Sequence, residues 1–480
     1  MKMVKSLLLG SAAGIVAIAG AQAADLPVKA KPVQYVKICS LYGVGFYYIP
    51  GTDMCLKVGG WARFETGVGY AGSFTTEWYA NDLNNRSTVG WHTRVKGTAT
   101  FDARSSTPYG TVRSYVAIGI STNNVADNPI SAGYANRWFI QWAGFTIGHS
   151  KSFFDFYSIG ANQYGFVTAS SDSGDGGWDV FGYTAQLGNG LSATISAEQS
   201  RRYNIRRGDA FGFGTVSGQL TNYEALQFPD VVANLRIDQG WGSAQIMGAL
   251  HGVTSTYYGS TEGTGHPSDA LGFAVGAGIK LNAPMIAKGD YFMAEVDYTQ
   301  GASRYSNMTA LQWDYVKYDG NNVGFGVNTD AVYGGSVAGG TASDLELTTT
   351  WAVNAAFTHY WNPAWKSTLW GSYRATSFNT QANNMLCNAL NGLGNNGTAA
   401  TAVTGCDMDW SAWGMGLRTE WAVSKTFQMG LEVLYANLNS ASNTSGLVTA
   451  GGSTKPAGTY SIADQDNWAV RLRVNRPFYP

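Results

Sequence analysis

Four aspartates stand in or directly after one segment rich in glycine and serine, residues 151–178. They are Asp155, Asp172, Asp175 and Asp179. Grouped carboxylates can hold a cation or set the electric field across a narrow passage. The spacing of these aspartates differs from that of an EF-hand calcium loop, which takes its first ligands from positions 1, 3 and 5. We therefore favour the second interpretation and expect no bound metal.

Basic residues form a second group, on the polar faces of segments before and after this one. They are Arg63, Arg94, Lys96, Arg113, Arg137, Arg471 and Arg473. Opposed acidic and basic side chains in a narrow aqueous passage set ion selectivity and orient dipolar solutes. The simpler alternative is that each of these residues is one of many charges on a solvated face.

Acidic residues also occur on polar faces elsewhere, so the sequence leaves open whether cations or anions would be preferred. These acids are Glu198, Glu295, Asp297, Glu420 and Glu432. A cluster of four arginines within residues 201–207 could bind lipopolysaccharide phosphates or attract anions to an opening. A solvated loop is the alternative interpretation of this cluster.

Four cysteines, Cys39, Cys55, Cys387 and Cys406, allow three disulfide connectivities. We expect Cys39–Cys55 and Cys387–Cys406, because local pairs close short loops in a chain exported to an oxidising compartment. A zinc site is the competing interpretation, but no pair has C-x-x-C spacing and no histidine lies near either pair.

Motifs for catalysis are not evident in the sequence. The five histidines show no metal-ligand spacing, and neither a G-x-S-x-G nor a Walker A sequence occurs. We expect neither enzymatic activity nor a cofactor. For a membrane barrel the alternatives to an unselective channel are a substrate-selective channel, a barrel hydrolase, and an adhesin-like or purely structural barrel.

The charged residues must be positioned by strands, because apolar and polar residues alternate with period two along most of the chain. In residues 89–102, for example, Val95 and Phe101 fall on one face, and Arg94 and Lys96 on the other. Sixteen such segments are predicted: 56–68, 89–103, 111–121, 134–142, 145–150, 179–187, 191–200, 228–238, 241–252, 270–282, 290–301, 346–361, 365–376, 410–422, 426–438 and 464–478. Short connections alternate with long ones, which is typical of an antiparallel barrel in an outer membrane.

Composition also favours the membrane. Charged residues make up 13% of the 480 residues, whereas soluble domains average about 25%. A soluble barrel or sandwich of sixteen strands would need a larger core than single domains build. Aromatic residues near segment ends fit interfacial girdles. They are Trp61, Tyr70, Trp142, Trp361, Trp365 and Trp421.

The first residues predict export. Lys2 and Lys5 precede an apolar stretch over 7–19, and Ala21-Gln22-Ala23 has the form of a signal-peptidase site, so 1–23 is expected to be a cleaved signal peptide. No later apolar run is long enough for a membrane helix. Lys and Arg number 31 against 32 Asp and Glu, a balance that excludes a nucleic-acid binder relying on phosphate neutralisation.

Several segments resemble the alphaproteobacterial porins. CSLYGVGFYYIPGT at 39–52, followed by CLKVGG at 55–60, is similar to the amino-terminal signature of that family. FIQWAGFTIG at 139–148 with SFFDF at 152–156 resembles its approach to a constriction loop, and GDGGWDVFGY at 174–183 resembles the exit. The resemblance implies a sixteen-stranded porin in the outer membrane that forms homotrimers and passes ions and small hydrophilic solutes.

We therefore expect an all-β chain, a sixteen-stranded antiparallel transmembrane β-barrel. It should have short periplasmic turns, long extracellular loops and a constriction loop over 151–178 folded inward. Residues 24–55 should form a lead-in with a disulfide, and 56–480 the barrel. Outer-membrane lipid and lipopolysaccharide are the expected surroundings.

Overall fold

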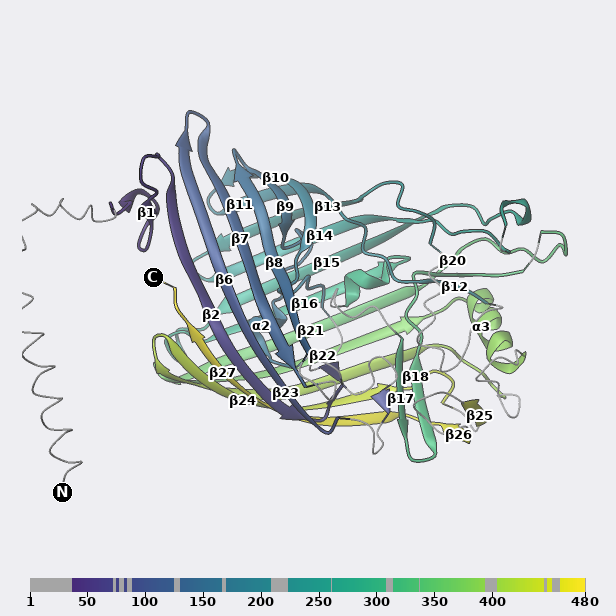
Figure 1. Cartoon of the computed structure of the whole chain (residues 1–480). Helices are drawn as coiled ribbons and strands as arrows, with labels where there is room; N and C mark the ends of the chain where they lie inside the picture. Colours follow the sequence, from purple (N-terminus) through teal and green to yellow (C-terminus); the bar gives the residue numbers. More distant parts are fainter. Residues whose placement is uncertain are drawn as a thin grey trace, which may run out of the picture.

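The computed structural model describes residues 37–71, 75–76, 82–83, 89–124, 130–165, 170–208, 223–259, 261–307, 314–335, 337–392, 404–443, 447–450 and 458–479. The predicted signal peptide, 1–23, lies outside this range. Sixteen antiparallel strands form one closed barrel (Figure 1). They are β2 (Cys55–Val68), β6 (Trp91–Thr107), β7 (Gly110–Asn123), β8 (Ile130–Trp142), β9 (Phe145–Ser150), β10 (Trp178–Gly188), β11 (Leu191–Glu198), β13 (Asp230–Gln239), β14 (Gly242–Val253), β15 (Ala270–Asn282), β16 (Tyr291–Gln300), β21 (Thr349–Asn362), β22 (Trp365–Ser377), β23 (Trp410–Ser424), β24 (Phe427–Asn439) and β27 (Gln465–Pro477).

The barrel closes where the last strand meets the first. Strand β27 pairs with β2 from Trp61 opposite Pro477 to Val68 opposite Val470, and with β24 on its other side. Every other barrel strand pairs with its neighbours in chain order. Closure leaves no free sheet edge, which a lipid environment requires. The predicted fold class is confirmed.

Side chains alternate between the outer surface and the interior along each strand. On β6, Val95 is 51% exposed and Thr98 only 3%. Val275 on β15 and Leu417 on β23 are likewise exposed on the outside. An apolar outer face and a polar inner face suit a barrel in lipid, and the facing predicted from the period of two is confirmed.

The aromatic residues proposed for interfacial girdles divide into two groups. Trp142, Trp361, Trp365 and Trp421 are exposed on the outer face near the short turns. Tyr70 is buried instead, and the arginine two residues after Trp61 stacks over the indole ring on the inner face. The prediction was wrong for Trp61, whose position in the strand alternation faces inward, and for Tyr70, because strand β2 ends before it and the chain turns inward.

Short turns join the strands at one end of the barrel (Figure 1). Ala143-Gly144 and Asn189-Gly190 each place two consecutive residues at positive φ, between 47° and 89°. Such a turn matches the twist of antiparallel strands. Long connections occupy the other end, as their lengths predict.

The long connections contain regular structure that the sequence did not predict. Short strands there are β3 (Tyr70–Ala71), β4 (Thr75–Thr76), β5 (Asp82–Leu83), β12 (Ile205–Arg207), β17 (Tyr315–Asp319), β18 (Asn322–Gly326), β19 (Ala331–Tyr333), β20 (Glu346–Leu347), β25 (Leu447–Ala450) and β26 (Gly458–Ile462). Single helical turns are α2 (Ile159–Asn162), η2 (Glu262–Thr264) and η3 (Ser303–Ser306), and α3 (Thr380–Gly392) is a longer α-helix. Three of their pairings, β12–β19, β5–β17 and β18–β26, join separate loops, and local sequence patterns carry no signal for such contacts.

Both predicted disulfides are present. Cys39–Cys55 links a small amino-terminal segment, which contains η1 (Ser40–Tyr42) and β1 (Tyr47–Tyr48), to the start of β2. Cys387–Cys406 joins α3 to the chain that leads into β23. Among the described residues, no helix is long and apolar enough to cross a membrane.

Candidate functional site

The connection between β9 and β10, residues 151–177, folds into the barrel as predicted. Its Phe156 lies against Gly278 on β15, where an added Cβ would stand 2.2 Å from the phenyl ring. Farther along, Tyr164 reaches Gly430 on β24, where a Cβ would lie 2.2 Å from the hydroxyl. Glycine at both wall positions permits this close approach, so the loop reaches two separate parts of the wall, β15 and β24.

One carboxylate of the wall binds the middle of this loop. Glu295 on β16 accepts hydrogen bonds from the amides of Phe156 (3.1 Å) and Tyr157 (2.5 Å). Its other oxygen accepts the amide of Ser171 at 3.1 Å. Amides that donate to a buried carboxylate are among the stronger hydrogen bonds in proteins. Glu295 therefore fixes both limbs of the loop at one point.

Two further wall carboxylates act in the same way. Glu432 on β24 accepts the amide of Tyr164 at 2.7 Å and that of Gly165 at 2.5 Å. On the other side, Glu198 on β11 accepts the amide of Phe153 at 2.9 Å. Acids that the sequence placed on the polar face thus serve to hold the loop.

Within the loop, two of the predicted aspartates are structural. Asp155 is buried and accepts hydrogen bonds from the amide of Ser173 and the guanidinium of Arg201, both at 2.7 Å. Burial opposes its charge, but Arg201 and Lys151 outweigh burial and hold the pKa of Asp155 below its usual range. Asp172 accepts the amides of Ile159 and Gly174, and burial raises its pKa.

The arginine cluster of 201–207 is therefore not a solvated loop throughout. Arg201 has no exposed surface. Arg206 pairs with Asp314 of another long connection. The short strand that contains Arg206, β12, pairs with β19. The sequence could not show that these two arginines are paired, because their carboxylate partners, Asp155 and Asp314, are distant in the sequence.

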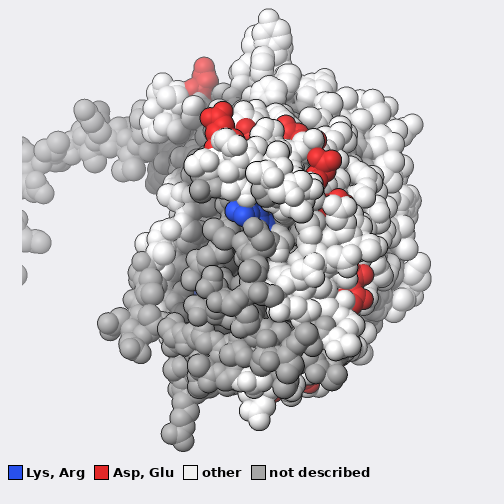
Figure 2. Space-filling model, turned by 90° about the vertical axis from the view of Figure 1, so that its right-hand side faces the viewer, with Lys and Arg blue, Asp and Glu red and all other residues white. Residues whose placement is uncertain are grey.

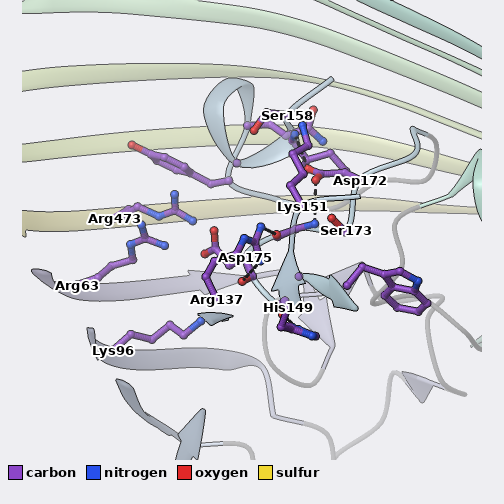
Figure 3. A pocket seen from close by; sticks show the side chains of 18 of the residues that line it. Arg63, Lys96, Arg137, His149, Lys151, Ser158, Asp172, Ser173, Asp175 and Arg473 are labelled. Atoms are coloured by element: carbon purple, nitrogen blue, oxygen red, sulfur yellow. Dashed lines mark hydrogen bonds between the residues drawn. The ribbon is translucent and has the colours of Figure 1, made fainter. Parts of the chain in front are cut away.

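A cavity of about 580 Å³ lies between the loop and the wall formed by β2, β6, β8 and β27 (Figure 3). Its charged lining consists of Arg63, Arg94, Lys96, Arg137, Lys151, Asp172, Asp175 and Arg473. In Figure 3, Arg63 and Arg473 extend from the strands toward Asp175 on the loop. Acidic and basic side chains of the predicted set therefore lie together around this cavity.

A bulge in β8 places Arg137 at this cavity. The register shifts between Ala117 and Ile118, which face Arg137 and Ala135 respectively. The extra residue, Asn136, reverses the alternation of the strand. Arg137 consequently points inward and donates to the carbonyls of Gly174 and Asp175, the latter at 2.7 Å.

Four of the predicted pore residues do not line this cavity. Arg113 bonds Asp102 near the short-turn end of β7. Asp179 pairs with His149, and Asp155 is enclosed within the loop. Arg471 is buried inside the barrel, where it pairs with Glu65 and donates to the carbonyl of Tyr164 on the loop. Whether each residue of the predicted set acts on permeating solutes stays a prediction.

Sequence reasoning missed two charged residues that matter here. Lys151 begins the loop and lines the cavity, and Glu65 on β2 is buried among three arginines. The polar-face position of Glu65, two residues from Arg63, was a signal that could have found it. Lys151 follows the last residue of β9, where the period-two alternation of a strand no longer predicts which way a side chain points.

Comparisons with known proteins agree with this architecture. The family model described as "Porin subfamily" matches residues 25–470. The chain is 34% identical over 257 residues to Porin Omp2b of Brucella suis biovar 1 and, equally, to that of Brucella abortus (strain 2308). Each match covers 50% of this chain and 64% of the relative's length.

A solved structure shows the same fold. The outer membrane channel DcaP of Acinetobacter baumannii superposes with a TM-score of 0.56 at 13% sequence identity, covering 90% of this chain and 99% of that one. At this identity the likeness concerns the fold alone.

Proposed function

Because this chain belongs to the porin subfamily and hence to the outer membrane, we propose that it forms a water-filled channel. Ions and small hydrophilic solutes would cross it by passive diffusion. The observation that carries this proposal is the charged cavity between the inward loop and the barrel wall. Sixteen strands enclose a lumen wide enough for water, and the loop narrows it.

The outer surface supports the same function. Apolar side chains such as Val95, Val275 and Leu417 cover the outside of the barrel, where they would contact lipid. Charged side chains line the inside, where they would contact water. A permeating ion would then stay hydrated along most of its path and would experience a strong electric field only at the constriction.

The remaining expectations belong to this proposal. The barrel acts as a channel and not as an enzyme, since the charged groups around the cavity are arranged to hold a loop and to face a passage. It assembles as a homotrimer in contact with outer-membrane lipid and lipopolysaccharide. Residues 1–23 are removed on export, and 24–55 form a lead-in to the barrel of 56–480.

Planar-bilayer recording of the purified protein tests the channel. We expect stepwise ohmic currents, with steps grouped in threes for a trimer, and no current from heat-denatured protein in the same detergent. A folded, inserted protein without conductance, or one that hydrolyses ester substrates instead, would contradict the proposal. Crosslinking measures the trimer separately, and amino-terminal sequencing of the exported protein measures signal cleavage.

A further inference from the structure

We propose that the constriction selects small anions, with carboxylates and phosphates as the class of organic solute it favours. This inference rests on the channel function proposed above and adds the sign of the charge that the channel prefers. It follows from which charges reach the cavity and which are neutralised elsewhere, a distinction that the charge count of the chain conceals.

Basic side chains outnumber acidic ones at the cavity. Six basic residues line it, against the two acids Asp172 and Asp175. Four of the six form no ion pair with any described residue. They are Arg63, Lys96, Arg137 and Lys151.

These four cations are held by neutral partners. Arg63 donates to the side-chain oxygen of Asn475, and the Lys96 ammonium lies 4.6 Å from the ring centre of Tyr134. Arg137 donates to backbone carbonyls of the loop, and the Lys151 ammonium lies 3.5 Å from the carbonyl oxygen of Phe156. Carbonyls and rings orient a cation without cancelling its charge, so these four positive charges remain at the cavity.

The other two cations share one carboxylate. Glu65 pairs with Arg94 at 2.5 Å, with Arg473 at 2.7 Å, and with Arg471. Glu65 itself has no exposed surface. One buried carboxylate among three guanidinium groups leaves an excess of positive charge. Two of these guanidinium groups, those of Arg94 and Arg473, line the cavity.

The acids elsewhere on the inner face of the barrel do not balance this excess at the cavity. Glu198, Glu295 and Glu432 are buried beneath the loop and bonded to its amides. On the loop, Asp172 is buried and bonded to two amides as well. Asp175 is the lining acid with an exposed side chain.

The location of the excess charge makes it effective. A charge in a narrow, partly dehydrated gap acts more strongly than one at a wide opening, where salt screens it within about 8–10 Å. Seen toward the long-loop end, Lys and Arg atoms lie deep in the hollow, while Asp and Glu atoms lie on the surrounding surface (Figure 2). Anions that enter would therefore be stabilised at the narrowest place, and cations repelled.

Reversal potentials in planar bilayers under a KCl gradient test the inference on the full-length protein. We expect the wild-type potential to have the sign of chloride preference. The double variant Arg63→Ser/Lys96→Ser should shift it toward zero or past it. Lys425→Gln, in an exposed turn at the short-turn end, removes one positive charge away from the cavity and should leave the potential unchanged.

A second measurement addresses the organic class. With KCl replaced by potassium phosphate or potassium succinate, we expect anion current to persist in the wild type and to fall in the double variant. A wild-type potential at zero or of the cation sign would overturn the inference while leaving the channel intact. Equal shifts in the double variant and in Lys425→Gln would overturn it as well. Absence of any conductance would instead refute the channel proposal.

Discussion

Asp155 of the constriction loop and Arg201 of the next long connection form an ion pair of 2.7 Å in which neither side chain is exposed. Arg201 also donates to Ser171 on the returning limb of the loop, and its own amide donates to Asp230 at the start of β13. The loop that narrows the lumen is thus joined to the external loops as well as to the wall. Its position depends on groups from three separate parts of the chain.

Breaking this pair should be costly. Asp155→Asn leaves the buried guanidinium of Arg201 without its counter-charge, and such a loss typically destabilises a protein by about 3–5 kcal/mol. We expect a lower unfolding midpoint in denaturant and noisier single-channel currents, because the loop loses an anchor. Asp238→Asn removes a half-exposed pair with Arg236, and should cost about 0–1 kcal/mol. Similar losses in both variants would show that the buried pair does not fix the loop.

The same pair predicts a pH dependence. The pKa of Asp155 lies below its usual range in the folded chain, so its contribution to stability is complete above the pKa of an unfolded aspartate. That contribution is lost as the pH falls through the lowered value. The stability difference between wild type and Asp155→Asn should therefore shrink on acidification below about pH 4. Denaturant unfolding of both proteins across acidic pH measures it, and a difference that grows instead would contradict this sign.

The wall carboxylate Glu295 should control the width of the passage. Glu295→Ala removes the acceptor of amides on both limbs of the loop, so we expect a larger single-channel conductance and a larger solute cutoff in liposome swelling. Glu262→Ala, on an exposed turn of another connection, is the matched control and should match the wild type. Unchanged conductance in a correctly folded Glu295→Ala protein would mean that the remaining anchors suffice.

The close approach of the loop to β15 can be tested with alanine. Gly278→Ala would place a Cβ 2.2 Å from the Phe156 ring, which forces the loop or the ring to move. Overpacking of this kind typically costs about 1–3 kcal/mol. Gly97→Ala on β6 has no atom within 4 Å of the added Cβ, so it should be nearly neutral. Unfolding midpoints compare the two, and equal midpoints would place the loop farther from β15.

Lipid exposure gives a prediction independent of the pore. Val275→Arg puts a charge on the outer face of β15, where it should cost about 2–4 kcal/mol if it lies near the bilayer midplane. Lys280→Ala, on the inner face of the same strand beside Tyr291, should cost much less. Folding into lipid vesicles measures both. A greater loss for the inner-face variant would reverse the assigned facing.

The sequence by itself determined the strands, their facing and their order. Period-two alternation depends only on neighbouring residues, so the segment 270–282 matches β15 residue for residue. Connection lengths and the local cysteine pairs are also properties of short stretches, and both were predicted correctly. Export and family resemblance rest on contiguous motifs.

Only the tertiary structure decided which charges meet. Alternation tells that Glu65, Arg113 and Glu295 face inward, but their height along the barrel depends on strand stagger, and their neighbours depend on loops that fold over them. Glu65 meets Arg471 across 406 residues of sequence because the barrel closes there. Arg113 faces the lumen too, yet its height places it beside Asp102. Such long-range pairs set the sign of the electric field at the constriction, because a buried and hydrogen-bonded carboxylate acts only weakly on the passage. No local pattern in the sequence predicts which carboxylates are buried in this way.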